Sequence, residues 1–435
     1  MSAEWQDTTL GQICAAQGGA IQTGPFGSQL HTSDYKEFGI PVVMPTNIGD
    51  GGIVEDGIAR IDQTDVDRLS QHKLKMGDIV FSRRGDVTKN ALIRQHEVGW
   101  FCGTGCLKVR LGDESIATAK FISHCLRLPD IKDWLIRHAV GATMPNLNTG
   151  ILSAVPIYLP PLQDQLQIAA TLGALDDRIT LLRETNATLE AIAQALFKSW
   201  FVDFDPVRAK LEGRAPEGMD EATAALFPDS FEESTLGLVP RGWRVATLAD
   251  TFEINPSRKL SKGSTAPYLD MASLATSGHC VEAPIEREMG SGAKFQNGDT
   301  LLARITPCLE NGKSAFVDFL ADGQIGWGST EFLVLRPRAP LPHYFGYLLC
   351  RHPAFREYAI QSMSGTSGRQ RVQNDVLGRY LLAVPVSEIA AIFAEVVESI
   401  QASILANHKT AQTLATLRDT LLPRLISGKL RVALE

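Results

Sequence analysis

The stretch QDQLQIAATLGALDDRITLLRETNATLEAIAQALFKSWFVD, residues 163–203, decides the fold of this protein. Its apolar residues recur at spacings of three and four, at Leu172, Leu175, Ile179, Leu182, Leu189, Ala193 and Leu196. An apolar stripe with a period of about 3.5 residues, kept over several heptads, is typical of a coiled coil rather than of a helix lying on a globular core. At about 1.5 Å per residue, the stretch predicts a rod of about 60 Å.

A second stretch near the end of the chain has the complementary pattern. Its apolar positions are Phe393, Val397, Ile400, Ile404, Ala411, Leu414 and Leu421. One position of each stripe is polar, Asn186 in the first and Asn407 in the second. A buried asparagine in such a seam can fix the helix register, whereas a partly exposed one is neutral, and both interpretations stay open here. We expect the two helices to pack as an antiparallel coiled coil whose far ends are marked by Pro206 and Pro423.

The rest of the chain contains an internal repeat. The run KMGDIVFSR at 75–83 corresponds to QNGDTLLAR at 296–304, and the strand-like run 155–160 corresponds to 380–385. The order of the matches is kept while their offset drifts, which indicates a diverged duplication with loop insertions. Short strand-like runs bounded by Gly, Asn and Asp, with helical patches between them, predict a mixed α/β (α+β) domain in each copy.

The repeat and the helices divide the chain into five expected segments with a pseudo-twofold internal repeat. These are a first globular domain at 1–160, a long spacer helix at 161–205, an acidic connector at 206–230, a second globular domain at 231–385, and a second spacer helix with the C-terminal tail at 386–435. The helix pair would then set the distance between the two globular domains.

Composition narrows the class of protein. The chain has 435 residues, of which 44% are hydrophobic and 21% are charged, as in soluble proteins of two to four domains. No apolar run approaches the roughly 18 residues of a membrane span, and the first ten residues are too polar for a signal peptide. Seven cysteines without a CxxC pair favour reduced thiols, with Cys102 and Cys106 along one buried strand. We expect a cytoplasmic protein without a metal site.

The net charge of −7 argues against nucleic-acid binding only when it is averaged over the whole chain. Residues 161–240 contain 6 basic and 14 acidic side chains, whereas residues 241–435 contain 21 basic and 18 acidic ones. Most of the negative charge therefore belongs to the first helix and the connector rather than to the globular domains.

No catalytic signature is present. The sequence lacks a GxxxxGK[ST] phosphate loop, a GxGxxG turn, the Asp/Asn-Pro-Pro-aromatic tetrapeptide of amino-methyltransferases, and the HExxH, GxSxG and zinc-deaminase patterns. We therefore expect a binding protein that is not an enzyme and that holds no cofactor of its own.

Polar loops recur at matching places in the two copies. Arginine suits guanine edges, asparagine and glutamine suit adenine edges, and glycine lets backbone amides approach a phosphate. The predicted DNA-binding residues are Gln22, Ser28, Gln29, Arg83, Arg84, Thr143, Asn146 and Asn148 in the first copy, and Arg258, Lys259, Arg304, Thr306, Thr366, Ser367, Arg369, Gln370 and Arg371 in the second.

Four motifs resemble those of the specificity subunit of a type I restriction-modification system. They are LQDQ at 162–165, LFKSWFVDFDPV at 196–207, GTSGRQR at 365–371 and LLPRLISG at 421–428. The resemblance covers essentially the whole chain. Because these motifs mostly build the scaffold, they identify the family well and the DNA target poorly.

The resemblance implies a role and a set of partners. Residues 1–160 and 231–385 would be target-recognition domains, each reading one half of a split, asymmetric site in double-stranded DNA. Two modification subunits would carry S-adenosylmethionine and methylate adenine, and restriction subunits would use ATP and Mg to translocate and cleave the DNA.

Two other classes of function stay open. The chain could be a structural or assembly protein whose two globular domains bind protein surfaces on a coiled-coil scaffold. A stand-alone methyltransferase or nuclease would require turnover by the isolated chain, which we do not expect.

Overall fold

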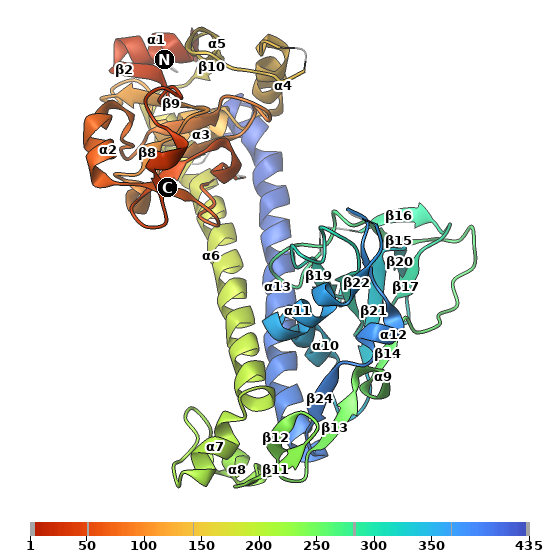
Figure 1. Cartoon of the computed structure of the whole chain (residues 1–435). Helices are drawn as coiled ribbons and strands as arrows, with labels where there is room; N and C mark the ends of the chain where they lie inside the picture. The colour runs from red at the N-terminus through yellow and green to blue at the C-terminus, as the bar shows by residue number, and fades with distance from the viewer. Residues whose placement is uncertain (1–4, 50–51, 142, 282–283, 367, 432–435) are drawn as a thin grey trace. The chain divides into compact units, whose positions relative to one another are not determined.

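In the computed structural model the chain forms two compact units, called here unit 1 (residues 1–180 with 412–435) and unit 2 (residues 181–411). The structure describes residues 5–49, 52–141, 143–281, 284–366 and 368–431. Two helices of 40 residues each, α6 (Leu162–Phe201) and α13 (Ser387–Ile426), contribute one part to each unit (Figure 1).

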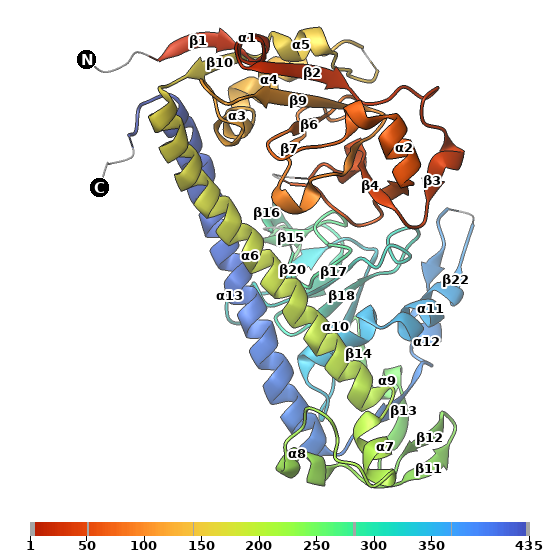
Figure 2. The ribbon, with the colours of Figure 1, turned by 90° about the vertical axis from the view of Figure 1, so that its left-hand side faces the viewer.

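Unit 1 is built on two four-stranded sheets and one separate strand pair (Figure 2). The first sheet has the order β2 (Gly18–Thr23), β9 (Cys106–Gly112), β6 (Ile79–Ser82), β7 (Asn90–Leu92). The second has the order β3 (Tyr35–Lys36), β5 (Ala59–Ile61), β4 (Ile40–Val43), β8 (Phe101–Cys102). The separate pair joins β1 (Gln6–Thr9) to β10 (Pro156–Leu159).

Unit 1 also has five short α-helices among the residues that the structure describes. They are α1 (Leu10–Ala16), α2 (Gln63–Arg68), α3 (Ala119–Cys125), α4 (Pro129–His138) and α5 (Thr149–Ser153), with short 3-10 helices at Thr32–Asp34, Pro45–Asn47, Ser70–His72 and Gln95–Glu97. One core joins Leu10 and Phe81 of this module to Leu172 of α6 and Leu422 of α13.

Unit 2 has the same sheet plan. Its first sheet has the order β14 (Phe252–Ile254), β21 (Phe332–Pro337), β18 (Thr300–Ala303), β19 (Ser314–Phe316). Its second has the order β16 (Ile285–Glu288), β15 (Thr265–Leu269), β20 (Gly326–Gly328), β17 (Ala293–Phe295). Its separate pairs are β13 (Arg244–Thr247) with β24 (Leu381–Val384), β11 (Phe231–Ser234) with β12 (Gly237–Pro240), and β22 (Met363–Ser364) with β23 (Arg371–Val372).

The helices of unit 2 include two short helices in the region of the acidic connector. They are α7 (Asp205–Leu211), α8 (Glu221–Leu226), α9 (Leu248–Thr251), α10 (His343–Arg351), α11 (Pro353–Gln361) and α12 (Asn374–Leu377). One core joins Phe345 of α10 to Phe201 of α6 and Phe393 of α13.

The strand pairing confirms the internal repeat. In each unit an antiparallel terminal strand leads into a helix that a threonine caps, Thr9 before α1 and Thr247 before α9. The register is also shared, since Ser82 pairs with Cys106 in unit 1 where Ala303 pairs with Phe332 in unit 2. The copies differ in the second sheet, where β3 pairs with β5 in unit 1 but β17 pairs with β20 in unit 2.

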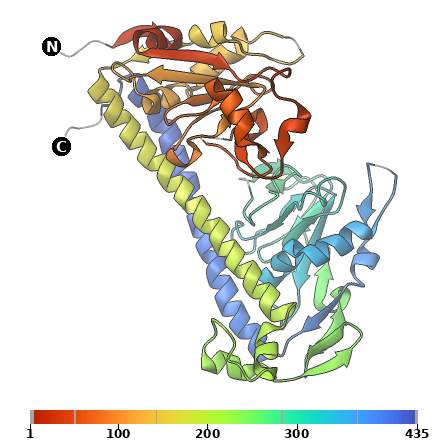
Figure 3. The same ribbon diagram turned by 60° about the vertical axis from the view of Figure 1, so that its left-hand side comes forward.

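The predicted coiled coil is confirmed (Figure 3). Residue numbers fall along α13 as they rise along α6, because the contacting pairs are Asp176 with Arg418, Asn186 with Asn407, and Phe201 with Phe393. The end predicted at Pro423 is wrong, since α13 continues to Ile426. Pro423 and Asp419, one turn earlier, are both exposed, so water can pair with the carbonyl that a proline leaves without a hydrogen bond.

Two smaller expectations need correction. Cys102 and Cys106 do not share a strand, because Cys102 ends β8 and Cys106 begins β9; both are buried free thiols. The statement that no apolar run reaches membrane length is wrong for α13, which contains an 18-residue window of mean hydropathy 1.7. The window has no more than two charged residues, and 28% of it is buried.

Candidate nucleic-acid interface

A buried aspartate anchors the start of β6 in unit 1. Gly77, at φ +82°, makes the turn that brings the Asp78 carboxylate under the backbone, where it accepts a hydrogen bond from Lys75 N at 2.8 Å. Arg110 of β9 donates to the same carboxylate through Nε at 2.7 Å and also through Nη2. The repeated Gly-Asp of the sequence is therefore a structural anchor that positions the end of the strand.

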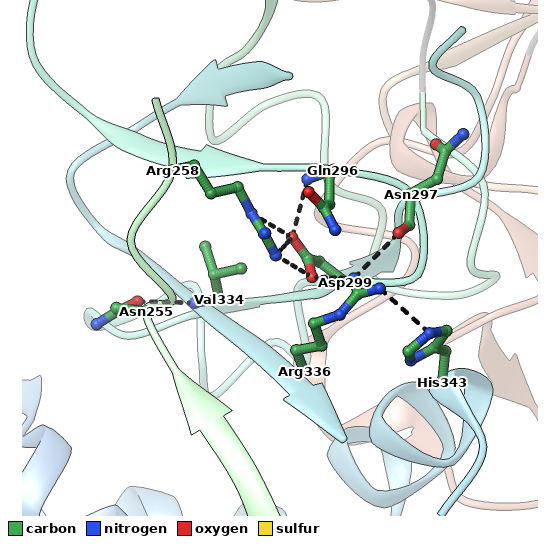
Figure 4. Close-up of polar contacts among 8 residues, drawn as sticks. All are labelled: Asn255, Arg258, Gln296, Asn297, Asp299, Val334, Arg336 and His343. Carbon is green, nitrogen blue, oxygen red and sulfur yellow. Dashed lines mark hydrogen bonds and ion pairs between the residues drawn. The ribbon is translucent and has the colours of Figure 1, made fainter. Parts of the chain in front are cut away.

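The equivalent anchor in unit 2 is larger (Figure 4). Asp299, with no exposed surface, accepts from Gln296 N at 2.8 Å, from Arg336 Nη1 at 2.8 Å and from Arg258 Nη2 at 2.6 Å. Arg258 was predicted to contact DNA, but its side chain is 9% exposed and its guanidinium points into this anchor. Its DNA contact stays a prediction that would require the ion pair to open.

After each anchored strand, the chain enters the same backbone frame. In unit 1, Arg83 N donates to Gly105 O at 2.8 Å, and Leu147 N donates to Arg83 O at 2.9 Å. In unit 2, the same two bonds run from Arg304 N to Glu331 O at 3.0 Å and from Val372 N to Arg304 O at 2.9 Å. These bonds establish the structural equivalence of Arg83 with Arg304, of Gly105 with Glu331 and of Leu147 with Val372.

A hairpin completes the frame in each copy. Asn146 pairs with Arg84 on one side and Val140 on the other. Arg371 likewise pairs with Ile305 and with Ser364. We call the first recognition edge Arg83, Arg84, Val140 and Asn146, and the second recognition edge Arg304, Ile305, Ser364 and Arg371.

The repeated glycines belong to the turns of these hairpins. Gly141 has φ +113° and Gly365 has φ +132°, a conformation that side chains with a Cβ rarely adopt. A Cβ at Gly141 would lie 2.6 Å from Met144 O, and one at Gly365 would lie 3.0 Å from Arg369 O. Gly141 and Gly365 therefore have the same task in the two copies, which is to make the turn of the hairpin.

The first recognition edge presents two arginines and an amide. Arg83 Nε donates to Asn146 Oδ1 at 3.2 Å, so the structure brings these two predicted residues together. Arg84 and Thr143 are exposed beside them. Donors of this kind suit both phosphate oxygens and base edges.

The second recognition edge carries a different set. Arg371 is paired with Glu331, and hydrogen bonds from Arg371 hold the pKa of the Glu331 carboxyl below its usual range. Arg304 donates through Nη2 to Val372 O, while its buried Nε has no partner within the described residues. Thr306 Oγ1 accepts from Gln370 N at 3.2 Å. Thr366 and Arg369 are exposed in the hairpin turn.

The remaining predicted residues lie elsewhere or have local tasks. Gln29 Oε1 accepts from Phe26 N at 3.1 Å, and Asn148 Oδ1 caps α5 through Ile151 N at 2.8 Å. Three other predicted residues outside the two edges and their hairpins are exposed: Gln22, Ser28 and Lys259. Ser367 lies outside the described residues.

The predicted register pair meets in the helix seam. Asn407 Nδ2 donates to Asn186 Oδ1 at 2.9 Å, and Asn186 Nδ2 donates to Ile404 O at 3.0 Å. Both side chains are partly buried. A mutual amide bond of this kind favours one register over a slipped one.

A polar network connects the globular part of unit 1 to α6 and α13. Asp176 of α6 accepts from Arg127 of the module at 2.6 Å and from Arg418 of α13 at 2.8 Å. Burial works to raise the pKa of Asp176, but the hydrogen bonds from Arg127 and Arg418 lower it overall. Beside them, burial lowers the pKa of His124 to about 4.

Unit 2 uses a different network for the same task. Tyr347 donates to Glu190 of α6 at 2.6 Å, and Gln401 of α13 donates to Asp318 at 2.6 Å. His279, fully buried, lies between Asp318 at 3.1 Å and Tyr344 at 2.9 Å. Sequence reasoning missed both networks, because their members lie far apart in the chain.

Glu331 was also missed, since an acidic residue attracts no attention in a search for DNA contacts. A signal was available in the sequence. Glu331 directly precedes a strand in the second copy, at the place that Gly105 occupies in the first. An acidic residue at that place can form an ion pair with one of the arginines that follow about 40 residues later.

Sequence comparisons find similar proteins among the specificity subunits of type I restriction enzymes. Residues 2–191 match the family model described as the type I restriction modification DNA specificity domain. The type I restriction enzyme HindI specificity subunit of Haemophilus influenzae is 25% identical over 419 residues, covering 84% of this chain and 89% of that protein. The MjaIX specificity subunit of Methanocaldococcus jannaschii is 25% identical over 331 residues, covering 72% and 69%.

A solved structure has the same fold. The S subunit of a type I restriction-modification system from M. genitalium superposes with a TM-score of 0.54 at 15% identity, covering 99% of this chain and 97% of that one. The resemblance seen in the sequence motifs is confirmed: residues 2–191 match the type I restriction modification DNA specificity domain, and the similar proteins are type I specificity subunits.

Proposed function

We propose that this chain is the non-catalytic DNA-reading subunit of a type I restriction-modification complex. Unit 1 reads one half of a bipartite, asymmetric site and unit 2 reads the other. The observation that carries the proposal is the recognition edge, one backbone frame that occurs twice with different side chains, Asn146 beside Arg83 and Arg371 beside Glu331. Because the same backbone frame carries different side chains in the two units, the two units suit a DNA site whose two halves differ in sequence.

The proposal includes partners that supply the chemistry. Two modification subunits would bring S-adenosylmethionine and methylate adenine, and restriction subunits would bring ATP and Mg. Exposed apolar residues on the long helices support the docking of protein partners: Leu181 and Ile192 on α6, and Val396 and Leu417 on α13, are 40–51% exposed. The assembly would work in the cytoplasm, where its DNA is.

Methylation mapping tests the proposal. The chain is expressed with its modification subunits in a host that lacks adenine methylation, and the methylated sites are sequenced. We expect one split motif with two unequal halves. Replacing unit 1 residues 5–160 with those of a relative should change one half only. No methylation motif, or a change in both halves, would overturn the proposal.

Salt dependence separates DNA reading from a purely structural role. Binding of the chain with its modification subunits to a duplex carrying the mapped motif should weaken about 1,000-fold or more between 50 and 200 mM salt if six or more phosphates are contacted. Preferred binding to that motif should persist over scrambled DNA. A chain that scaffolds proteins would show neither property.

A further inference from the structure

The Arg371 side chain of the second recognition edge is held by a carboxylate along one edge of its guanidinium. Nε donates to Glu331 Oε1 at 3.0 Å and to Oε2 at 2.9 Å, and Nη2 donates to Oε1 at 2.6 Å. The Arg371 side chain is nevertheless 41% exposed, while that of Glu331 is 23% exposed. The ion pair therefore fixes the guanidinium without covering it.

The ion pair with Glu331 leaves a second edge of the Arg371 guanidinium, the one formed by Nη1 and Nη2, without a partner within the described residues. A guanidinium has five N–H groups, and Glu331 takes the one on Nε and one on Nη2. Nη1 makes no hydrogen bond to any residue that the structure describes. One hydrogen of Nη1 and the second hydrogen of Nη2 form a parallel pair of donors, which is the geometry that matches O6 and N7 of guanine.

The backbone under this side chain is also fixed. Arg371 is paired with Ile305 on one side and Ser364 on the other, and the next residue, Val372, is fully buried. Glu331 is held in turn, because its N–H donates to Ser329 Oγ at 3.1 Å and its carbonyl accepts from Arg304 N. A side chain that is already oriented loses little entropy when it binds a base.

We infer that Arg371 is a specificity-determining residue for a guanine in the half-site that unit 2 reads, and that Glu331 is the positioning residue that orients it. The inference rests on the proposed function and deepens it. The equivalent positions of unit 1 are Asn146 and Gly105, so the first recognition edge lacks this arrangement.

The test measures base preference at each position of the mapped motif, using the chain with its modification subunits and competing duplexes. Arg371→Lys keeps the charge and removes the fork. It should reduce the preference for guanine at one position of the unit 2 half-site by about 5- to 150-fold, which is the range for one bidentate contact. The other half-site should not change.

Glu331→Gln should act in two opposite directions. Removing a negative charge near phosphates should raise the affinity for scrambled DNA, while the loosened guanidinium should lower the preference for guanine several-fold. A residue that served only to stabilise the fold would lower both affinities together. The control is the exposed i,i+4 pair of Asp375 and Arg379, 73–74% exposed, as Asp375→Asn and Arg379→Lys, which should alter neither preference.

A modified base identifies the contact. A duplex with 7-deazaguanine at the responsive position lacks the N7 acceptor, so it should weaken binding by wild type but not weaken binding by Arg371→Lys further. Melting curves of each variant report whether it folds. If Arg371→Lys does not fold, Arg371→Gln takes its place as the test variant.

The outcomes are distinguishable from those of the proposed function. If no sequence preference exists at all, the proposed function fails. If the split motif exists but Arg371→Lys changes no position, or lowers affinity uniformly for every sequence as a phosphate contact would, the guanine assignment is wrong. If Arg371→Lys removes the guanine preference and Glu331→Gln leaves it intact, the positioning role is wrong.

Discussion

Unit 1 and unit 2 use the same backbone frame and differ in how they support it. The aspartate anchor of unit 1 has one arginine partner, Arg110, whereas Asp299 of unit 2 has two, Arg258 and Arg336. At the edge itself, unit 1 exposes an amide where unit 2 exposes an arginine held by an acid. Both units share the frame because hydrogen bonds of the main chain define it, while the side chains that point away from it differ.

Asp299→Asn should give the largest effect. The substitution leaves two guanidiniums, 9% and 21% exposed, without a counter-charge, which costs about 3–5 kcal/mol in the free energy of unfolding of unit 2. Hydrogen exchange of amides in β18 and β21 measures that free energy. Asp78→Asn should cost unit 1 less, about 2 kcal/mol, because Arg110 is 31% exposed and water can solvate it. Equal losses in the two units would contradict this comparison.

Gly141→Ala tests the hairpin of the first recognition edge. The added Cβ would meet a backbone carbonyl 2.6 Å away at φ +113°, and the strain should destabilise the hairpin by about 2 kcal/mol. We expect methylation to lose selectivity in one half-site, with global melting little changed. Gly365→Ala should do the same for the other half-site, and less strongly, since its nearest contact is 3.0 Å. Gly27→Ala, with open space around it and no positive φ, is the matched control.

Acid should destabilise unit 1 through His124. Its folded pKa of about 4 lies below the ordinary value near 6.5, so the unfolded state binds the proton first. The contribution of His124 is complete above about pH 6.5 and is lost as the pH falls toward 4, by about 2 kcal/mol at pH 5. Denaturant unfolding at pH 7.5 and 5 measures the loss, and His124→Gln should reduce it. The exposed His31, as His31→Gln, should leave the loss as it is.

The asparagine pair should give the smallest effect. Asn186→Leu removes the acceptor of Asn407 Nδ2 and should cost about 1 kcal/mol, because both amides are partly exposed. The double variant Asn186→Leu, Asn407→Leu should recover that loss by packing in the seam, while a disulfide-trapping assay detects slipped registers. A double variant that keeps a single register would remove the role assigned to the asparagines.

Much of the fold was predictable from local patterns. The heptads at 172–196 and 393–421 identified both long helices, and the runs 75–83 and 296–304 identified the same strand in each copy. The end of α13 was misplaced because a proline breaks a helix only where its lost hydrogen bond cannot be replaced by water. The candidate site was predictable in outline, since both recognition edges contain residues chosen from the sequence.

Local patterns did not predict which polar side chains are paired within the protein and which remain available for DNA. Arg258 and Arg371 look alike in the sequence, yet the first is enclosed by Asp299 and the second is held open by Glu331. Gln29 and Asn148 matched the composition of DNA-reading loops and instead support local turns. The hydrogen-bond partner of each side chain decides whether that side chain is available for DNA. Sequence periodicity does not predict which residue the partner will be.

The sequence by itself determined the helices, the duplication and the family resemblance, because each depends on short local patterns: apolar periodicity, turn glycines and runs of similar residues. The tertiary structure decided which charges remain available for DNA. That choice depends on pairs separated by 40 or more positions, such as Glu331 with Arg371 and Asp176 with Arg418, and only folding brings those residues within the few ångströms at which they bind.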